Sequence, residues 1–432
     1  MIEAVFEAGV KSGFSVTETF QEKTDRKEYE SFGGLESVHQ AETDRLIVRA
    51  FWDTGDPVGF VLSAIDQKNI GRSFSQIRSL VKPDRKKNFA HLLPREIQKT
   101  PLDICDHSFA NVRDERVREM GERVNEALIS LPGLKVARFS FSKTLRKVQI
   151  ANSHGLLAKY KKSLFCLSLT FSLRDNLVEL GETRIFVDQI NPERLVSRAF
   201  NLIGSITENQ RVEARSESII LSPEASALVL REFSDHLKMG GGLAKRNEMV
   251  ASDKLNVVDH PLLGQLSGSV PFDDEGVQSG EKYLINKGYS IAPISDIRTA
   301  FAHRKNSSGN GFRDERGIFP AIQFSNLFIK PTSFSLGHLM REARRGILVS
   351  LLKVKESGWG QGAYLFSAHG FQFQNEEIGE PVHFYLRTSF PTFAVRIEKI
   401  SKELRFFHAR FNIGSPYVLI RGKFNSEKIF CV

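Results

Sequence analysis

Cysteine is scarce in this sequence. The 432 residues contain three, at Cys105, Cys166 and Cys431, and none of them forms a C-x-x-C pair. An odd number of widely separated cysteines excludes a disulfide framework and a cysteine-rich zinc site. Such usage fits a reduced compartment, so we expect a cytoplasmic protein.

Long apolar runs are also missing. The longest candidate, Ser163–Leu173, is shorter than the roughly 18 residues that a membrane span needs, and it is typical of a buried strand. The N-terminus carries Glu3 and Glu7 where a signal peptide would place Lys or Arg before an uninterrupted apolar segment. We therefore expect no membrane partner and no export.

Charge of one sign does not dominate the chain. Lys and Arg number 60 and Asp and Glu 51, so the formal charge is 60 − 51 = +9. The densest basic runs, Lys82–Lys87 and Lys159–Lys162, are expected to be solvated faces rather than phosphate-binding patches. We therefore do not expect nucleic acid as a partner. The sequence also lacks a Walker loop, a GxSxG elbow and a GxGxxG fingerprint.

What is present indicates an α+β fold. Asn111–Ile129 has the apolar spacing of an amphipathic helix, and Leu46–Phe51 followed by Val58–Ile65 is typical of a strand hairpin. We expect an N-terminal α/β domain with an antiparallel sheet over residues 1–210. A β-rich, barrel-like domain over residues 211–432 should follow, because short alternating segments and Gly/Pro turns prevail there.

The second half holds one clear helix signal. Ser222 is a suitable N-cap, Pro223 suits the first helical position, and Gly240–Gly242 is a strong breaker. We therefore expect a helix from Ser222 to Gly240. Farther on, Lys305–Gly317 is the best candidate for a mobile loop.

This helix carries an R-E-x-x-x-H pattern, at Arg231, Glu232 and His236. A regular helix puts Glu232 and His236 on one face, because they are four positions apart. A carboxylate beside an imidazole suits metal-assisted hydrolysis, in which the imidazole binds the cation and the carboxylate takes a proton from bound water. The same pair also arises often as a partly exposed polar pair, so the spacing alone leaves both interpretations open.

A family resemblance extends through the chain. Leu221–His236 is similar to the TldD/PmbA family, whose metal-bearing branch carries H-E-x-x-x-H followed by Gly-rich sequence. The other segments that carry the resemblance, in chain order, are Arg45–Ser63, Val258–Gly276, Lys282–Ile291, Gly337–Val349, Phe366–Asn375, Gly379–Val382 and Gly414–Gly422. The last segment is similar to the closing strand of the PmbA side of the family.

The resemblance implies a metalloprotease subunit or a metal-free relative, two of which pair into a peptidase for small or unstructured peptides. It assigns the general base to Glu232 and the second metal His to His236, whereas Arg231 replaces the first metal His. The third ligand of the catalytic branch, a Cys before the closing strand, has no counterpart, because Cys431 comes after it. Arg stays protonated and only donates, so it cannot bind zinc. We expect Arg231 to pair with Glu232 or, better, with Asp235 at i+4.

The turn Asp273, Asp274, Glu275 and Gly276 is a further feature of the resemblance. Three adjacent carboxylates can hold a hard cation such as Ca²⁺ or Mg²⁺. The alternative, which we favour, is a solvated turn whose Asp side chains accept local backbone N–H groups and whose Gly276 takes positive φ.

Three hypotheses follow. The first is a TldD/PmbA-like subunit that supports proteolysis by pairing with an H-E-x-x-x-H homologue or with itself. It needs no cofactor of its own, and zinc sits in the partner. The second is a divergent zinc metallopeptidase that uses Glu232, His236 and a distant ligand such as His408. The third is a non-catalytic peptide-binding or assembly module.

Overall fold

The computed structural model describes residues 1–32, 35–53, 56–62, 69–80, 90–129, 134–173, 176–206, 218–242, 246–359, 362–408, 411–424 and 429–431. The predicted domain boundary at 210/211 and the basic run Lys82–Lys87 lie outside these residues. No helix in the described part of the chain is long and apolar enough to cross a membrane. The three cysteines are unpaired, as their spacing predicts.

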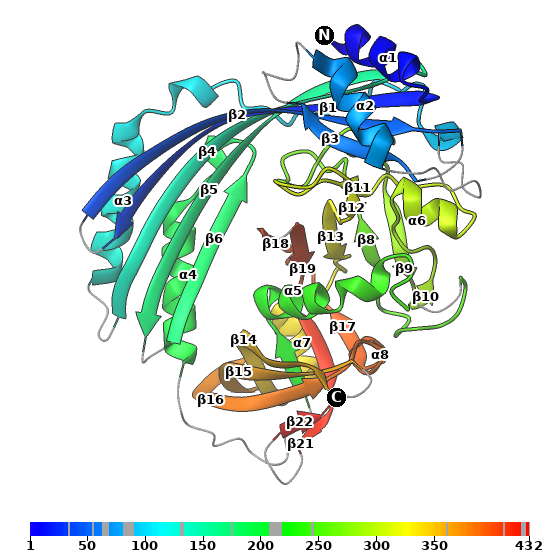
Figure 1. Cartoon of the computed structure of the whole chain (residues 1–432). Coiled ribbons are helices and arrows are strands. Elements are labelled where there is room, and N and C mark those ends of the chain that lie inside the picture. The colour runs from blue at the N-terminus through cyan, green and yellow to red at the C-terminus, as the bar shows by residue number, and fades with distance from the viewer. Residues whose placement is uncertain are drawn as a thin grey trace.

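The N-terminal half is built on one antiparallel sheet of six strands in the order β3-β2-β1-β4-β5-β6. The strands are β1 (Val16–Phe32), β2 (Leu35–Phe51), β3 (Val58–Leu62), β4 (Leu134–Asn152), β5 (Leu157–Leu173) and β6 (Asn176–Arg184). Four of them are 17 or 19 residues long, and they curve together over the rest of the molecule (Figure 1). The expected hairpin is confirmed as β2 and β3.

Helices cover the sheet in two places. Near its start, α1 (Ile2–Lys11) and α2 (Ile70–Leu80) pack Val5 and Phe74 onto β2 and β3. At the other end, α3 (Asp114–Ile129) and α4 (Pro192–Ser205) pack onto β4, β5 and β6. The amphipathic helix expected at Asn111–Ile129 is thus confirmed as α3, and Val117, Met120 and Val124 of its apolar stripe are buried.

The C-terminal half contains two further large sheets and a short ribbon. Their orders are β10-β9-β8-β13-β19-β18, β17-β20-β7-β14-β15-β16-β22-β21 and β11-β12. The strands are β7 (Ser218–Leu221), β8 (Val257–Asp259), β9 (Lys282–Asn286), β10 (Tyr289–Ser290), β11 (Gly311–Phe312), β12 (Ala321–Ile322), β13 (Asn326–Ile329), β14 (Arg345–Trp359), β15 (Ala363–Gln374), β16 (Glu377–Thr388), β17 (Ile397–Ile400), β18 (Arg405–His408), β19 (Asn412–Ser415), β20 (Val418–Arg421), β21 (Lys423–Phe424) and β22 (Ile429–Cys431).

In the described ranges, four α-helices accompany these sheets: α5 (Pro223–Glu232), α6 (Ile297–Ala302), α7 (Leu336–Ala343) and α8 (Phe390–Val395). Helix α5 lies between the two large sheets in Figure 1, and its apolar residues join one core with both of them. The predicted α+β class is confirmed: the chain is mostly sheet, with a curled, half-barrel sheet.

One loop differs from its prediction. Lys305–Gly317, expected to be mobile, contains strand β11, and its residues Asn310, Gly311 and Arg313 are buried. The Gly- and Ser-rich composition of this loop suggested conformational mobility, but buried hydrogen bonds fix its conformation. The Asn310 amide, for example, donates to Asp259 over 2.8 Å.

Candidate functional site

Helix α5 begins as the sequence predicts and ends earlier. Ser222 Oγ accepts the N–H of Ala225 over 3.2 Å, and Pro223 occupies the first helical position. The helix ends at Glu232 rather than at Gly240, and Ser234–Leu237 form a separate 3-10 turn. The residue that caps this end of the helix, Phe233, is fully buried against rings of β15 and α8.

Because α5 ends at Glu232, Glu232 and His236 do not lie on one continuous α-helix. The His236 ring stacks on Phe390, with centroids 5.6 Å apart and planes 13° apart. Its Nδ1 lies 3.1 Å from the Gly241 carbonyl oxygen, which can only accept, so Nδ1 carries a proton and cannot bind a metal ion. The prediction that one regular α-helix carries both Glu232 and His236 is therefore wrong.

Arg231 pairs with its neighbour. Its Nε and Nη2 donate to Glu232 Oε1 over 3.0 and 2.8 Å, and both side chains are partly exposed. Asp235, the partner favoured from helical spacing, instead pairs with Lys238 over 2.7 Å. The i+4 argument fails because the helix has ended before position 235.

These residues do not fit a catalytic zinc. Such a site takes three protein ligands and a water, and here His236 Nε2 is the one suitable nitrogen in the R-E-x-x-x-H segment. His408 lies elsewhere, with Nδ1 3.4 Å from Ser267 Oγ, and Cys431 is on strand β22. Within the described ranges, no group of three His, Cys, Asp or Glu residues is placed to hold a metal ion.

The acidic turn is the second predicted feature, and it is buried rather than solvated. Asp273, Asp274 and Glu275 are 0%, 1% and 3% exposed. The expected local hydrogen bonds are present: Asp273 Oδ1 accepts the N–H groups of Glu275 and Val277 over 3.0 and 2.9 Å. Gly276 has φ +78°, as predicted.

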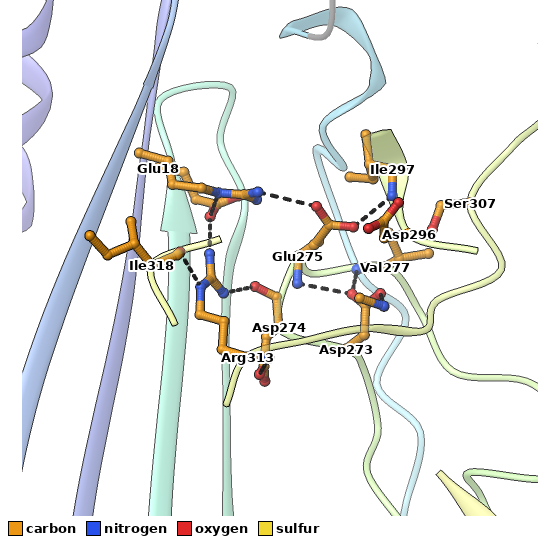
Figure 2. A network of polar contacts seen from close by, with 12 residues as sticks. Glu18, Asp273, Asp274, Glu275, Val277, Asp296, Ile297, Ser307, Arg313 and Ile318 are labelled. Atoms are coloured by element: carbon orange, nitrogen blue, oxygen red, sulfur yellow. Dashed lines mark hydrogen bonds and ion pairs between the residues drawn. The ribbon is translucent and has the colours of Figure 1, made fainter. Parts of the chain in front are cut away.

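Figure 2 shows Arg313 and Glu18 beside this turn, and Arg49 binds it as well. The motifs in the sequence did not point to these three residues. Glu275 Oε1 accepts from Arg49 of β2 over 3.1 Å, and Arg49 also binds both oxygens of Glu18 of β1 over 2.8 Å each. Arg313 donates to Glu18 over 3.0 Å, and its guanidinium lies 4.4 Å from the Phe20 ring centroid. The sequence did contain one sign of this network: Arg49 is a charged residue inside the otherwise apolar strand segment Leu46–Phe51, and a buried charge needs a partner.

The network extends to a second pair of strands. Arg146 of β4 lies 3.6 Å from Asp274 Oδ1 and donates to Glu22 of β1 over 2.5 Å. Burial raises the pKa of the Asp274 carboxyl above its usual range, while Arg146 and Arg313 oppose that rise. Burial likewise raises the pKa of Glu275, against the effect of Arg49.

This arrangement joins the two halves of the chain rather than holding a cation. The guanidinium groups of Arg49 and Arg146 and several backbone N–H groups already face the carboxylate oxygens of the turn. An arginine beside a carboxylate repels a divalent ion. The Ca²⁺ or Mg²⁺ interpretation of the turn is therefore not supported by its surroundings.

Next to the turn lies a polar cavity of about 220 Å³, lined among others by Arg146, Lys162, Asp274 and His408. Lys162, expected on a solvated face, is 4% exposed, and its Nζ donates to the carbonyl oxygens of Ser267 and Ser269. Burial, with repulsion from Arg146, lowers the pKa of Lys162 to about 7.

Comparison with known proteins shows what the chain is similar to. A family model described as the PmbA/TldA metallopeptidase C-terminal domain matches residues 216–424. Over this C-terminal region, the chain is similar to the TldD/PmbA family. A metalloprotease of Methanothermobacter thermautotrophicus is 28% identical over 173 residues, which are 38% of each chain. The Metalloprotease PmbA homolog of Buchnera aphidicola is 24% identical over 249 residues, 54% of this chain and 52% of that relative.

The family fold extends beyond the region of sequence similarity. TldE from Thermococcus kodakarensis superposes with a TM-score of 0.83 over 98% of this chain and 99% of that chain, at 19% identity. A putative modulator of DNA gyrase from Bacteroides thetaiotaomicron gives the same TM-score at 17% identity, over 98% of this chain and 97% of that one. By sequence, however, the match spans only about two fifths of the length of the first curated relatives.

Proposed function

We propose that this chain is a non-hydrolytic, PmbA/TldE-like subunit that supports peptide hydrolysis by a homologous, metal-bearing partner. The observation that carries the proposal is the pair of Arg231 and Glu232. Where the family resemblance puts the first metal His and the general base, the chain has a fixed cation that binds the carboxylate over 2.8 Å. A guanidinium at this place repels a divalent cation and holds the carboxylate that would take a proton from water.

The partner then supplies zinc, water and general base, and this chain supplies part of the peptide channel. Two edge strands support a role in peptide binding. Strand β6 ends the N-terminal sheet and β18 ends a C-terminal sheet, and the two strands are in contact. An extended peptide can add to such an edge through backbone hydrogen bonds, with little dependence on its side chains. The unpaired cysteines are consistent with a cytoplasmic, reducing setting.

Metal content and peptidase activity test the proposal. The purified chain, alone and mixed with an H-E-x-x-x-H homologue, is assayed on an unstructured peptide with and without chelator. We expect the isolated chain to be inactive and the mixture to exceed the homologue alone at least tenfold. Glu232→Gln should leave the activity of the mixture unchanged, as should Glu248→Gln, an exposed acid that serves as the matched control.

Two results would overturn the proposal. About one zinc per isolated chain, with chelator-sensitive hydrolysis abolished by Glu232→Gln alone, would establish a divergent metallopeptidase. A mixture no more active than the homologue by itself would leave a peptide-binding or assembly module without a role in hydrolysis.

A further inference from the structure

A pocket lined by arginines lies where the two halves of the chain meet. Its volume is about 490 Å³. Strand β6 and helix α4 form the N-terminal side, and strand β18 with residues 264–266 forms the C-terminal side. Gln189 and Gln265 hydrogen-bond across it over 2.9 Å. No feature of the R-E-x-x-x-H segment or of the acidic turn takes part in this pocket.

Positive charge exceeds negative charge there. The lining includes Arg184, Arg194, Arg198 and Arg405, and Glu182 is the acid among them. Glu182 forms ion pairs with two of these four arginines, Arg184 over 2.5 Å and Arg194 over 2.9 Å.

The other two arginines differ in their partners. Arg198 pairs with Glu224 over 3.1 Å, whereas Arg405 makes no ion pair among the residues that the structure describes. Four guanidinium groups therefore face two carboxylates, Glu182 and Glu224, which leaves an excess of 4 − 2 = +2.

Two of these cations have lost most of their contact with water. The side chains of Arg184 and Arg198 are 21% and 15% exposed. Burial lowers the pKa of Arg184, Glu182 opposes this, and Arg194 and Arg198 lower it further by repulsion. An added anion would relieve this repulsion and accept charge-assisted hydrogen bonds in a planar geometry that guanidinium groups favour.

One wall of the pocket is apolar. Leu266, Leu404, Phe406 and Phe407 contribute to it, and the Arg198 guanidinium lies 5.3 Å from the Phe407 ring centroid. A free phosphate would use only the cationic side. A carboxylate attached to an apolar residue would use both sides.

We propose that this pocket binds a carboxylate group of a peptide, either its C-terminus or an acidic side chain, next to an apolar residue. That the anion belongs to a peptide rests on the proposed function, whereas the binding of an anion does not. The position agrees with that role, because β6 and β18 both line the pocket and both end their sheets. A peptide added to either edge would lie beside the arginines.

Calorimetric titration of the full chain tests the pocket without any hydrolysis. N-acetylphenylalanine is the probe, its amide is the uncharged analogue, and inorganic phosphate is the competing anion. We expect Arg405→Gln and Arg194→Gln each to weaken binding of N-acetylphenylalanine about tenfold or more, because a hydrogen bond to a charged group contributes about 1.5–3 kcal/mol. The control is Arg123→Gln, which removes an equally exposed arginine from α3 and should bind like the wild type.

The outcomes separate the alternatives. Equal binding of the acid and its amide, or equal loss in Arg123→Gln, would overturn the proposal. Phosphate binding that exceeds N-acetylphenylalanine binding and falls in the same two variants would identify a site for free phosphate instead. If the carboxylate binds as expected but the chain does not stimulate the homologue, the proposed function fails and the anion site stands.

Discussion

At the scale of single residues, Lys162 is a buried lysine whose Nζ donates to two backbone carbonyl oxygens instead of to water. It sits on β5, and the carbonyls belong to Ser267 and Ser269 of the other half of the chain. The charged form of Lys162 therefore destabilises the folded state, because its ammonium group keeps hydrogen bonds but loses most of its hydration. The lowered pKa, about 7, expresses this cost.

The cost predicts a particular pH dependence. In the unfolded chain Lys162 binds its proton up to a pH of about 10.4, but in the folded chain it releases the proton above about 7. Between these values the unfolded state binds more protons, so stability rises with pH. The penalty is complete below pH 7 and disappears toward pH 10.5.

Lys162→Met measures this effect. The free energy of unfolding of the wild type, minus that of Lys162→Met, should increase from pH 7 to pH 10, by at most about 1.4 kcal/mol per pH unit. Urea unfolding at pH 7, 8.5 and 10 gives the difference. Lys161→Met removes the exposed neighbouring charge, and its difference from wild type should be flat. Parallel curves for both variants would contradict the prediction.

At the scale of elements, the acidic turn depends on one glycine. Gly276 has φ +78°, and an added Cβ would lie 2.5 Å from Leu156 Cδ2 of the N-terminal half. A side chain there meets both a disfavoured backbone conformation and a clash in a packed core.

We therefore expect Gly276→Ala to lower the free energy of unfolding by about 2–4 kcal/mol. Gly280→Ala is the matched control four residues away, because no atom lies within 4 Å of its added Cβ. It should change stability by less than about 0.5 kcal/mol. Chemical denaturation of both variants measures the two values, and similar losses would show that the turn tolerates a side chain.

Elements also show what sequence can predict here. Helix α3 is predictable because its apolar period and its first-turn acids are local, and α5 begins where Ser222 and Pro223 indicate. The end of α5 is not, because Phe233 is buried by rings from β15 and α8, more than 130 positions away. Its early end decides the geometry of the candidate site.

In the acidic turn, too, the local geometry was predictable from the sequence and the distant charged partners were not. Asp273 and Gly276 behave as the local pattern predicts, since an Asx turn and a positive φ need only neighbouring residues. The burial of the turn was not predictable locally. It depends on Arg49, 226 positions away, and on Arg313, 39 positions away, which supply the charges that make burial of the carboxylates tolerable.

At the scale of the whole molecule, the acidic turn joins the two halves of the chain. Phe272, next to the turn, packs with Phe20, Ile47 and Ile150 of the N-terminal sheet. Arg49 of the same sheet binds both Glu18, also in that sheet, and Glu275 of the turn. A buried ion pair adds little net stability over an apolar substitute for both partners, but removal of one partner leaves a buried charge uncompensated. The two halves should therefore unfold as one unit. Loss of the Arg49 charge should lower the stability of both halves.

Arg49→Met tests that coupling, because it keeps an unbranched apolar stem and removes the charge between Glu18 and Glu275. We expect a loss of about 3–5 kcal/mol in the free energy of unfolding. Hydrogen exchange should show the same loss in β4 and β5 as in β14 and β15, since the network is shared. Arg118→Met is the control: its pair with Glu36 is more than half exposed, so its loss should stay below about 1 kcal/mol. A loss confined to β4 and β5 would mean that the halves fold independently and that the network only positions them.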